Sequence, residues 1–174
     1  IDGVLDCDLA AYCPIDSTLN VDLSALSAVC SLDGKNMVLF TNETFHQIAS
    51  KLRFKDRERN MIDHISADFV AKNHQIEILP FRLDMDRYSF IVGGQHSMDM
   101  SFNYHIDVLK SPIPFNFGLD VNGKVGDFKY NLGKTRYTIL FNRPIQHEEY
   151  RMSKQRRLDE EKVEILREFR NVIP

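Results

Sequence analysis

The histidines and carboxylates are the side chains of this chain best suited to chemistry, and their spacing argues against a catalytic or metal site. The six histidines make no HxH or HExxH pair and no zinc-ligand spacing with the cysteines. Asp84 and Asp86 alternate along an expected strand, which places both carboxylates on one face as an acid–base pair requires, but a solvated strand gives the same spacing. No serine lies in a GxSxG motif. We therefore expect no catalytic residue, no metal and no cofactor.

The three cysteines, Cys7, Cys13 and Cys30, leave the redox compartment open. An odd number is a poor disulfide framework, and no pair has CxxC spacing. They are interpreted either as small buried hydrophobic residues or as one disulfide plus a free thiol.

Composition and length bound the class of protein. The chain has 174 residues, 43% hydrophobic and 27% charged, which fits one soluble domain with a real core. A formal net charge of -3 argues against a nucleic-acid surface, so we expect no nucleic-acid partner. The sequence contains no run of about 18 apolar residues, so it predicts no membrane-spanning helix. The start at Ile1-Asp2-Gly3, without Met, suggests an excised fragment with any targeting segment upstream.

The strongest pattern in the chain is a strict alternation that begins at Met98 and resumes after residues 111–114. Polar residues separate its apolar members, as in a strand with one apolar and one polar face. The alternation predicts one apolar sheet face made by Met98, Met100, Phe102, Tyr104, Ile106, Val108, Phe115, Phe117, Leu119 and Val121. Such a face is a surface, not a constellation of reactive groups.

Turn signals divide the rest of the chain into short strands. Asp33-Gly34 and Asn122-Gly123 predict tight hairpins, and Asn73-His74 predicts a turn. Pro80 predicts an edge or a bulge within the strand 76–85, and Gly93-Gly94 predicts a break, bulge or bend. About seven or eight strands in near-unbroken succession indicate antiparallel meander pairing.

Two helices are expected beside these strands. Asn42 caps the first, near residues 42–53, whose apolar residues Phe45, Ile48, Ala49 and Leu52 recur at helical spacing. The second is a charged helix near residues 147–171, with a loose apolar stripe of Leu158, Val163, Leu166 and Phe169.

The predicted fold class is α+β and mainly antiparallel β. We expect one curved, strongly twisted meander sheet, a groove or half-barrel, with the 42–53 helix packed against it and a charged C-terminal helix. Residues 1–142 form the β-rich domain and residues 143–174 the helical tail.

Four stretches carry a resemblance to a known family. They are MVLFTNETFHQIASKLRFKDRERNMIDHISADF (37–69), ILPFRLDMDRYSFIVGG (78–94), MDMSFNYHIDVLKSPIPFNFGLDVNG (98–123) and FKYNLGKTRY (128–137). With these stretches the chain resembles the C-terminal region of the AsmA-like family, relatives of AsmA and TamB, particularly the versions of Bacteroidetes-type bacteria. The resemblance covers roughly residues 1–137 and leaves out the charged tail.

The resemblance implies an envelope protein of diderm bacteria, anchored in the inner membrane upstream of this segment and otherwise periplasmic. It implies an apolar β-groove that carries phospholipid acyl chains toward the outer membrane, and no catalytic residues. The ten residues of the apolar face then contact lipid. Alternatively, the same face is only the core of the domain, covered by the 42–53 helix. The chain is then a protein-interaction or scaffold module of the envelope, whose C-terminal helix docks partner proteins.

Overall fold

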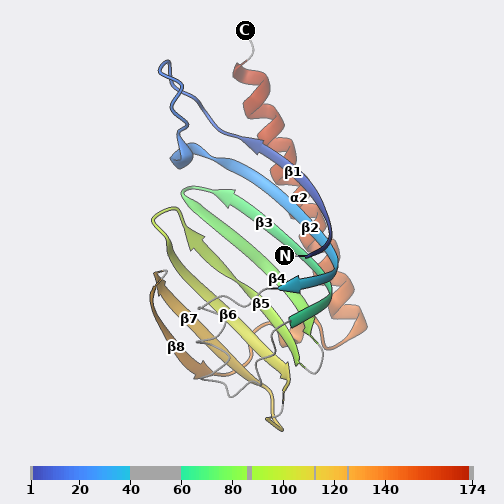
Figure 1. Ribbon diagram of the computed structural model, residues 1–174. Coiled ribbons are helices and arrows are strands. Elements are labelled where there is room, and N and C mark those ends of the chain that lie inside the picture. Colours follow the sequence, from blue (N-terminus) through green and yellow to red (C-terminus); the bar gives the residue numbers. More distant parts are fainter. Residues whose placement is uncertain (1, 40–59, 86–87, 112, 125, 173–174) are drawn as a thin grey trace.

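The computed structural model describes residues 2–39, 60–85, 88–111, 113–124 and 126–172, and within them the chain forms one antiparallel sheet and one long helix. The eight strands pair in sequence order, β1 to β8, and the sheet does not close on itself. The predicted α+β class and meander are confirmed (Figure 1). The strands are β1 (Asp2–Tyr12), β2 (Ser27–Leu39), β3 (Asn60–Lys72), β4 (Gln75–Met85), β5 (Tyr88–Ser97), β6 (Ser101–Lys110), β7 (Phe117–Lys124) and β8 (Asp127–Gly133).

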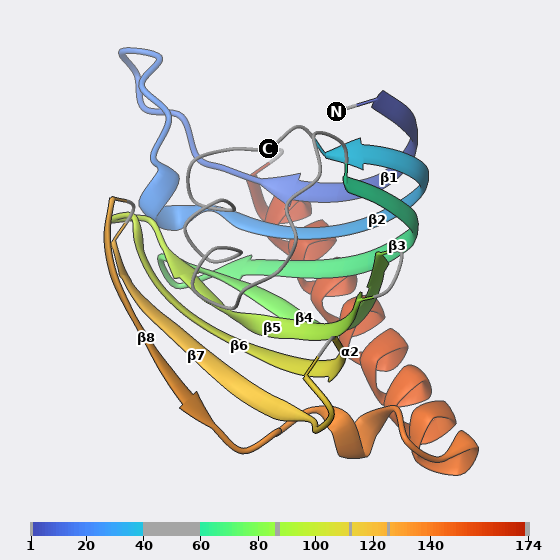
Figure 2. The same cartoon turned by 60° about the horizontal axis from the view of Figure 1, so that its bottom comes forward.

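The sheet is curved, and the helix α2 (Pro144–Val172) lies against its outer side (Figure 2). Two short 3-10 helices, Leu23–Ala25 and Thr138–Leu140, lie in the connections before β2 and before α2. The helix expected near residues 42–53 lies outside the described residues, whereas the charged C-terminal helix is present and begins three residues before its predicted start.

Two of the local signals are confirmed, one marking a hairpin turn and the other an irregularity within a strand. Asn73 and His74 connect β3 to β4 with φ values of 53° and 65°, the positive values that a two-residue hairpin turn requires. Pro80 lies at an irregularity between Ile78 and Phe81, where the register of β4 against β5 shifts. The carbonyl of Pro80 is free to accept a bond of 2.7 Å from the hydroxyl of Tyr150 on α2.

The glycine signals are only partly correct. Asp33-Gly34 lies inside β2, so the hairpin predicted there is wrong. Asn122-Gly123 lies inside β7, and the β7–β8 hairpin is present but turns only after Lys124. Gly93-Gly94 lies inside β5 and does not end the strand, and the register irregularity between Ile78 and Phe81 of β4 lies opposite it. Each pair has a strand on both sides, so backbone hydrogen bonds to two neighbours outweigh the local preference for a turn. At Gly94 the φ of +149° and a neighbouring carbonyl of Asn103 only 2.3 Å from any added Cβ explain the glycine as a close approach of β6.

The helix α2 packs on the sheet through a small apolar contact. Leu158 and Ile165, two turns apart, are 3% and 5% exposed, and they join Val29, Val70 and Leu79 from β2, β3 and β4 in one cluster. Val163, Leu166 and Phe169 lie on the exposed side of the helix, so the predicted stripe divides between two faces.

Ion pairs set the register of α2 along the strands. The four acidic or basic strand residues and their helix partners are Asp8–Lys162, Asp68–Lys154, Lys72–Glu161 and Glu77–Arg157. The Asp68–Lys154 pair is the least exposed, at 10% and 18% of the side chains. The Arg157 guanidinium donates two hydrogen bonds to the Glu77 carboxylate, which raise the pKa of Arg157. Half-exposed pairs stabilise little individually, so Leu158 and Ile165 supply most of the docking energy.

Replacing Leu158 with Ala should weaken this docking. We expect a loss of about 2–5 kcal/mol in the free energy of unfolding, because the change leaves a cavity between α2 and three strands. The matched control is Leu166→Ala on the exposed side of the same helix, which should change stability by less than about 0.5 kcal/mol. Denaturant unfolding measures both, and equal losses for the two variants would contradict the packing described.

Candidate functional site

The two faces of the sheet are assigned by the residues that contact α2. Asp8, Asp68 and Glu77 bond to the helix, so their side chains lie on the outer face. Because neighbouring side chains along a strand alternate, Leu9, Phe69 and Ile78 lie on the opposite face. We call this opposite face, on the side away from α2, the inner face.

The inner face is apolar across all eight strands. Strand pairing carries the assignment from β1 to β8, because residues paired across a ladder lie on the same face. Its apolar members include Leu5, Leu9, Leu32, Ile65, Phe69, Ile76, Ile78, Phe81, Leu83, Phe90, Val92, Phe128, Tyr130 and Leu132.

Seven of the ten predicted face residues lie together on this inner face. Tyr104 pairs with Val121, Ile106 with Leu119, and Val108 with Phe117, in adjacent β6 and β7. Phe102 lies one step further along β6, opposite Gly123. The predicted residues therefore form a contiguous two-strand block within a wider apolar surface.

The other three lie outside the strands, so the predicted strand limits are wrong there. Met98 and Met100 belong to the connection between β5 and β6, where the Met100 amide bonds to the Ser97 carbonyl at 3.0 Å and its φ is 67°. Phe115 precedes β7 and is 65% exposed, with its ring centroid 6.2 Å from that of Phe117. The prediction failed there because apolar and polar residues keep alternating in the sequence beyond the ends of the strands, although the backbone is no longer extended.

Burial on the inner face varies from strand to strand. Val108 and Leu119 are 0% and 1% exposed, whereas Leu9 on β1 and Leu132 on β8 are 60% and 68% exposed. The apolar surface therefore includes buried residues on the central strands and exposed residues on both edge strands.

Aromatic rings gather at one end of the inner face. The Phe102 ring stacks on Tyr104 at 5.2 Å and lies 6.2 Å from Phe128. His96 stacks beside both Phe102 and Tyr104, and its Nδ1 lies 2.9 Å from the Tyr104 hydroxyl. Burial raises the pKa of Tyr104. This end therefore combines a large apolar area with one polar pair.

The outer face of β6 and β7 carries a buried polar cluster that the sequence did not predict. His105 and Asp107 are 2% and 0% exposed. The His105 Nε2 lies 2.8 Å from the Asp107 Oδ1 and its Nδ1 lies 2.7 Å from the Asp120 Oδ1, so the imidazole bridges the two carboxylates. Arg136 donates to the other Asp120 oxygen at 2.8 Å.

Asp107 fastens the connection that follows β8. Its carboxylate accepts the backbone amides of Arg136, Tyr137 and Thr138 at 2.7–2.9 Å, and the Thr138 hydroxyl at 2.8 Å. The Tyr137 ring stands edge-on to His105 at 5.4 Å. Sequence reasoning placed His105 and Asp107 among outward polar positions. No local signal reveals their burial, because their partners outside this pair are 15–31 residues away.

The hydrogen bonds of the cluster join its own side chains and the backbone of residues 136–138. The Thr138 hydroxyl donates to Asp107, so no hydroxyl or thiol stands against His105 in the hydrogen bonds of the cluster. Asp84, the described member of the Asp84–Asp86 pair, bonds to Arg82 at 3.0 Å. Over residues 2–39, 60–85, 88–111, 113–124 and 126–172, no group of three or more histidine, cysteine, aspartate or glutamate side chains is placed to hold a metal.

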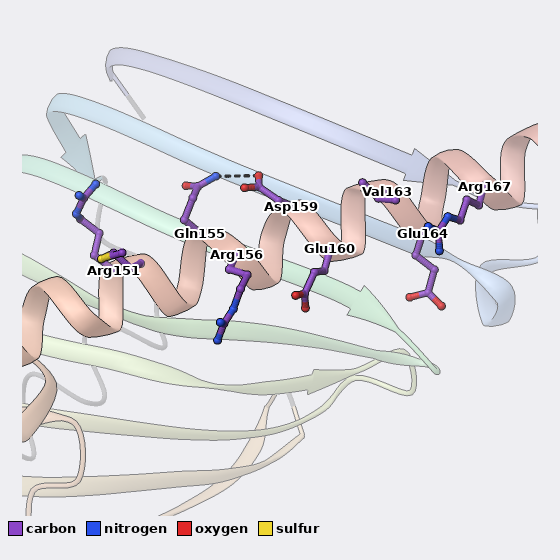
Figure 3. A pocket seen from close by; sticks show the side chains of 9 residues that line it. Arg151, Gln155, Arg156, Asp159, Glu160, Val163, Glu164 and Arg167 are labelled. Atoms are coloured by element: carbon purple, nitrogen blue, oxygen red, sulfur yellow. Dashed lines mark hydrogen bonds between the residues drawn. The ribbon is translucent and has the colours of Figure 1, made fainter.

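The outward side of α2 carries a shallow hollow whose lining comes from α2 alone (Figure 3). Arg151, Arg156 and Arg167 alternate there with acidic residues, and Gln155 bonds to Asp159 at 3.0 Å. With a single helix as its wall and charges of both signs, this hollow has the character of a solvated helix surface.

No protein-family model, curated protein or solved structure matches this chain.

None of the helices in the described part of the chain combines the length and the apolar character needed to cross a membrane.

Gly118 tests how closely the outer-face cluster is packed. A Cβ at Gly118 would lie 2.2 Å from the Lys134 carbonyl oxygen and 2.8 Å from the His105 ring, so Gly118→Ala must displace backbone. We expect a loss of about 1–3 kcal/mol in the free energy of unfolding.

The control for this prediction is Gly133→Ala on the neighbouring strand, where the nearest atom is 3.9 Å away. Its unfolding free energy should stay within about 0.5 kcal/mol of the wild type. If the Gly118 variant were as stable as the Gly133 variant, the connection formed by residues 134–138 would not be packed closely against Gly118.

Proposed function

We propose that this chain is a non-enzymatic, periplasmic segment of an AsmA-like envelope protein that shields phospholipid acyl chains on its inner face. It serves transport of phospholipid to the outer membrane of a diderm bacterium, or assembly of that membrane. The lipid-contacting block is Phe102, Tyr104, Ile106, Val108, Phe117, Leu119 and Val121.

The observation that carries the proposal is the division of the two sheet faces. The helix α2 takes the outer face, where its contacts combine one small apolar cluster with ion pairs. The larger apolar area lies on the other side and extends to exposed Leu9 and Leu132 on the two edge strands. In a two-layer domain whose helix only completes a core, the larger apolar face would lie under the helix.

Lipid transport requires an apolar surface that shields acyl chains from water, and the inner face is such a surface. An acyl chain removed from a membrane needs shielding worth roughly 0.8 kcal/mol per buried CH₂. An antiparallel sheet can offer one continuous apolar face while its backbone groups are hydrogen-bonded between strands. The function needs no reactive group.

A second candidate function is a protein-interaction or scaffold module of the cell envelope. It is favoured by Val163, Leu166 and Phe169 on α2, which are 47–58% exposed. In this candidate the inner face belongs only to the core, and the partner binds the outward side of α2.

Photocrosslinking distinguishes the two candidates. A photoreactive amino acid at Phe102 or Phe117, in protein made in a diderm bacterium, should yield a phospholipid adduct detectable by mass spectrometry. The same group at Val163 on α2 is the matched control and should yield none. Adducts only within the chain at both inner-face positions would contradict the lipid role and leave that face as core.

The scaffold candidate makes the opposite prediction for the same set of proteins. Crosslinks at Val163 to one specific envelope protein, lost on Leu166→Glu and accompanied by no lipid adduct at Phe102, would establish it in place of lipid handling.

A further inference from the structure

Two of the three cysteines meet on the inner face, where the edge strand β1 pairs with β2. Cys7 on β1 pairs with Leu32, and Cys30 on β2 pairs with Leu9, so the two cysteines are diagonal neighbours on the same face. Their Sγ atoms lie 3.6 Å apart. Cys13 lies beyond them, where its thiol donates to the Asp22 carbonyl at 3.3 Å.

We propose that Cys7 and Cys30 are the site of an intramolecular disulfide that fastens the edge strand β1 to β2. A disulfide requires an S–S separation of about 2.05 Å, so the sulfurs must approach by about 1.5 Å. β1 can make this adjustment because, in the described part of the chain, it pairs with β2 alone. The inference does not depend on the lipid role.

The two thiols have different parts in the reaction. Cys7 is exposed, so its thiolate attacks a small-molecule disulfide, forming a mixed disulfide and releasing one thiolate. Cys30 then loses its proton and attacks the Cys7 sulfur, which releases the second thiolate. Two protein thiols are thus oxidised to one disulfide, and the small-molecule disulfide is reduced to two thiols.

The surroundings of Cys30 make it the slower partner. Burial, the bond with Cys7 and the nearby Asp68 and Asp8 carboxylates raise its pKa to about 11. The thiolate is the attacking species, so the first step belongs to Cys7 and the closing step to Cys30.

The bond would act on an otherwise weakly held strand. Val4, Leu5 and Leu9 of β1 are 50–66% exposed, and an edge strand with unpaired backbone groups opens easily and pairs with other chains. A link from Cys7 to Cys30 ties the middle of β1 to β2 while both strands keep their register.

The test is oxidation of the full chain with oxidised glutathione, followed by non-reducing peptide mapping. The expected product is monomeric, two hydrogens lighter, and contains a peptide in which Cys7 is linked to Cys30. Hydrogen exchange of the β1 amides should be slower in this product than in the reduced chain. Cys13→Ser is the matched control and should form the same bond, whereas Cys30→Ser should form none.

Three results would overturn the proposal. They are a disulfide that includes Cys13, a persistent glutathione adduct on Cys7, and three free thiols after oxidation. Unchanged hydrogen exchange in β1 after the Cys7–Cys30 bond has formed would overturn the claim that the bond fastens the edge strand.

Discussion

The carboxylate of Asp107 is the constraint on which the arrangement of this molecule depends. It is fully buried on the outer face of β6, and it accepts three successive backbone amides of the connection that follows β8. A buried carboxylate without hydrogen-bond partners is strongly unfavourable. The backbone amides of residues 136–138 supply those partners, and the Asp107 carboxylate in turn satisfies the three amides. Because this connection is held on the outer face, the helix that follows it is directed along that same face.

The position of α2 then determines what the two faces of the sheet can do. The outer face is occupied by the helix, by its ion pairs with β1, β3 and β4, and by the His105–Asp107–Asp120 cluster. The inner face keeps most of the large apolar side chains, including an aromatic group around Phe102 at one end. The outer face buries only a small apolar cluster under α2, beside these polar contacts, whereas the larger apolar area lies on the inner face. This division underlies the proposed lipid role.

The sequence predicted those features that are local or periodic. Alternation in 101–108 and 117–121 gave the apolar face and its parity, and Asn73-His74 marked a true hairpin, because positive φ is a property of those two residues. The glycine pairs were less reliable markers of turns. Gly94 and Gly123 lie where neighbouring strands approach closely, and neither lies in a turn. The Asp107 cluster could not be foreseen, because its bonds join segments about 30 residues apart and its residues look like ordinary polar positions of a half-buried strand.

The central claim, that the inner face and not α2 meets acyl chains, can be tested with a single fluorophore because the chain contains no tryptophan. We would introduce Phe102→Trp on the inner face and, in a separate protein, Val163→Trp on the outward side of α2, and add phospholipid brominated along its acyl chains. The account predicts strong, saturable quenching of the Phe102→Trp protein and little quenching of the Val163→Trp protein. Equal quenching at both positions, or quenching of the Val163→Trp protein alone, would contradict it.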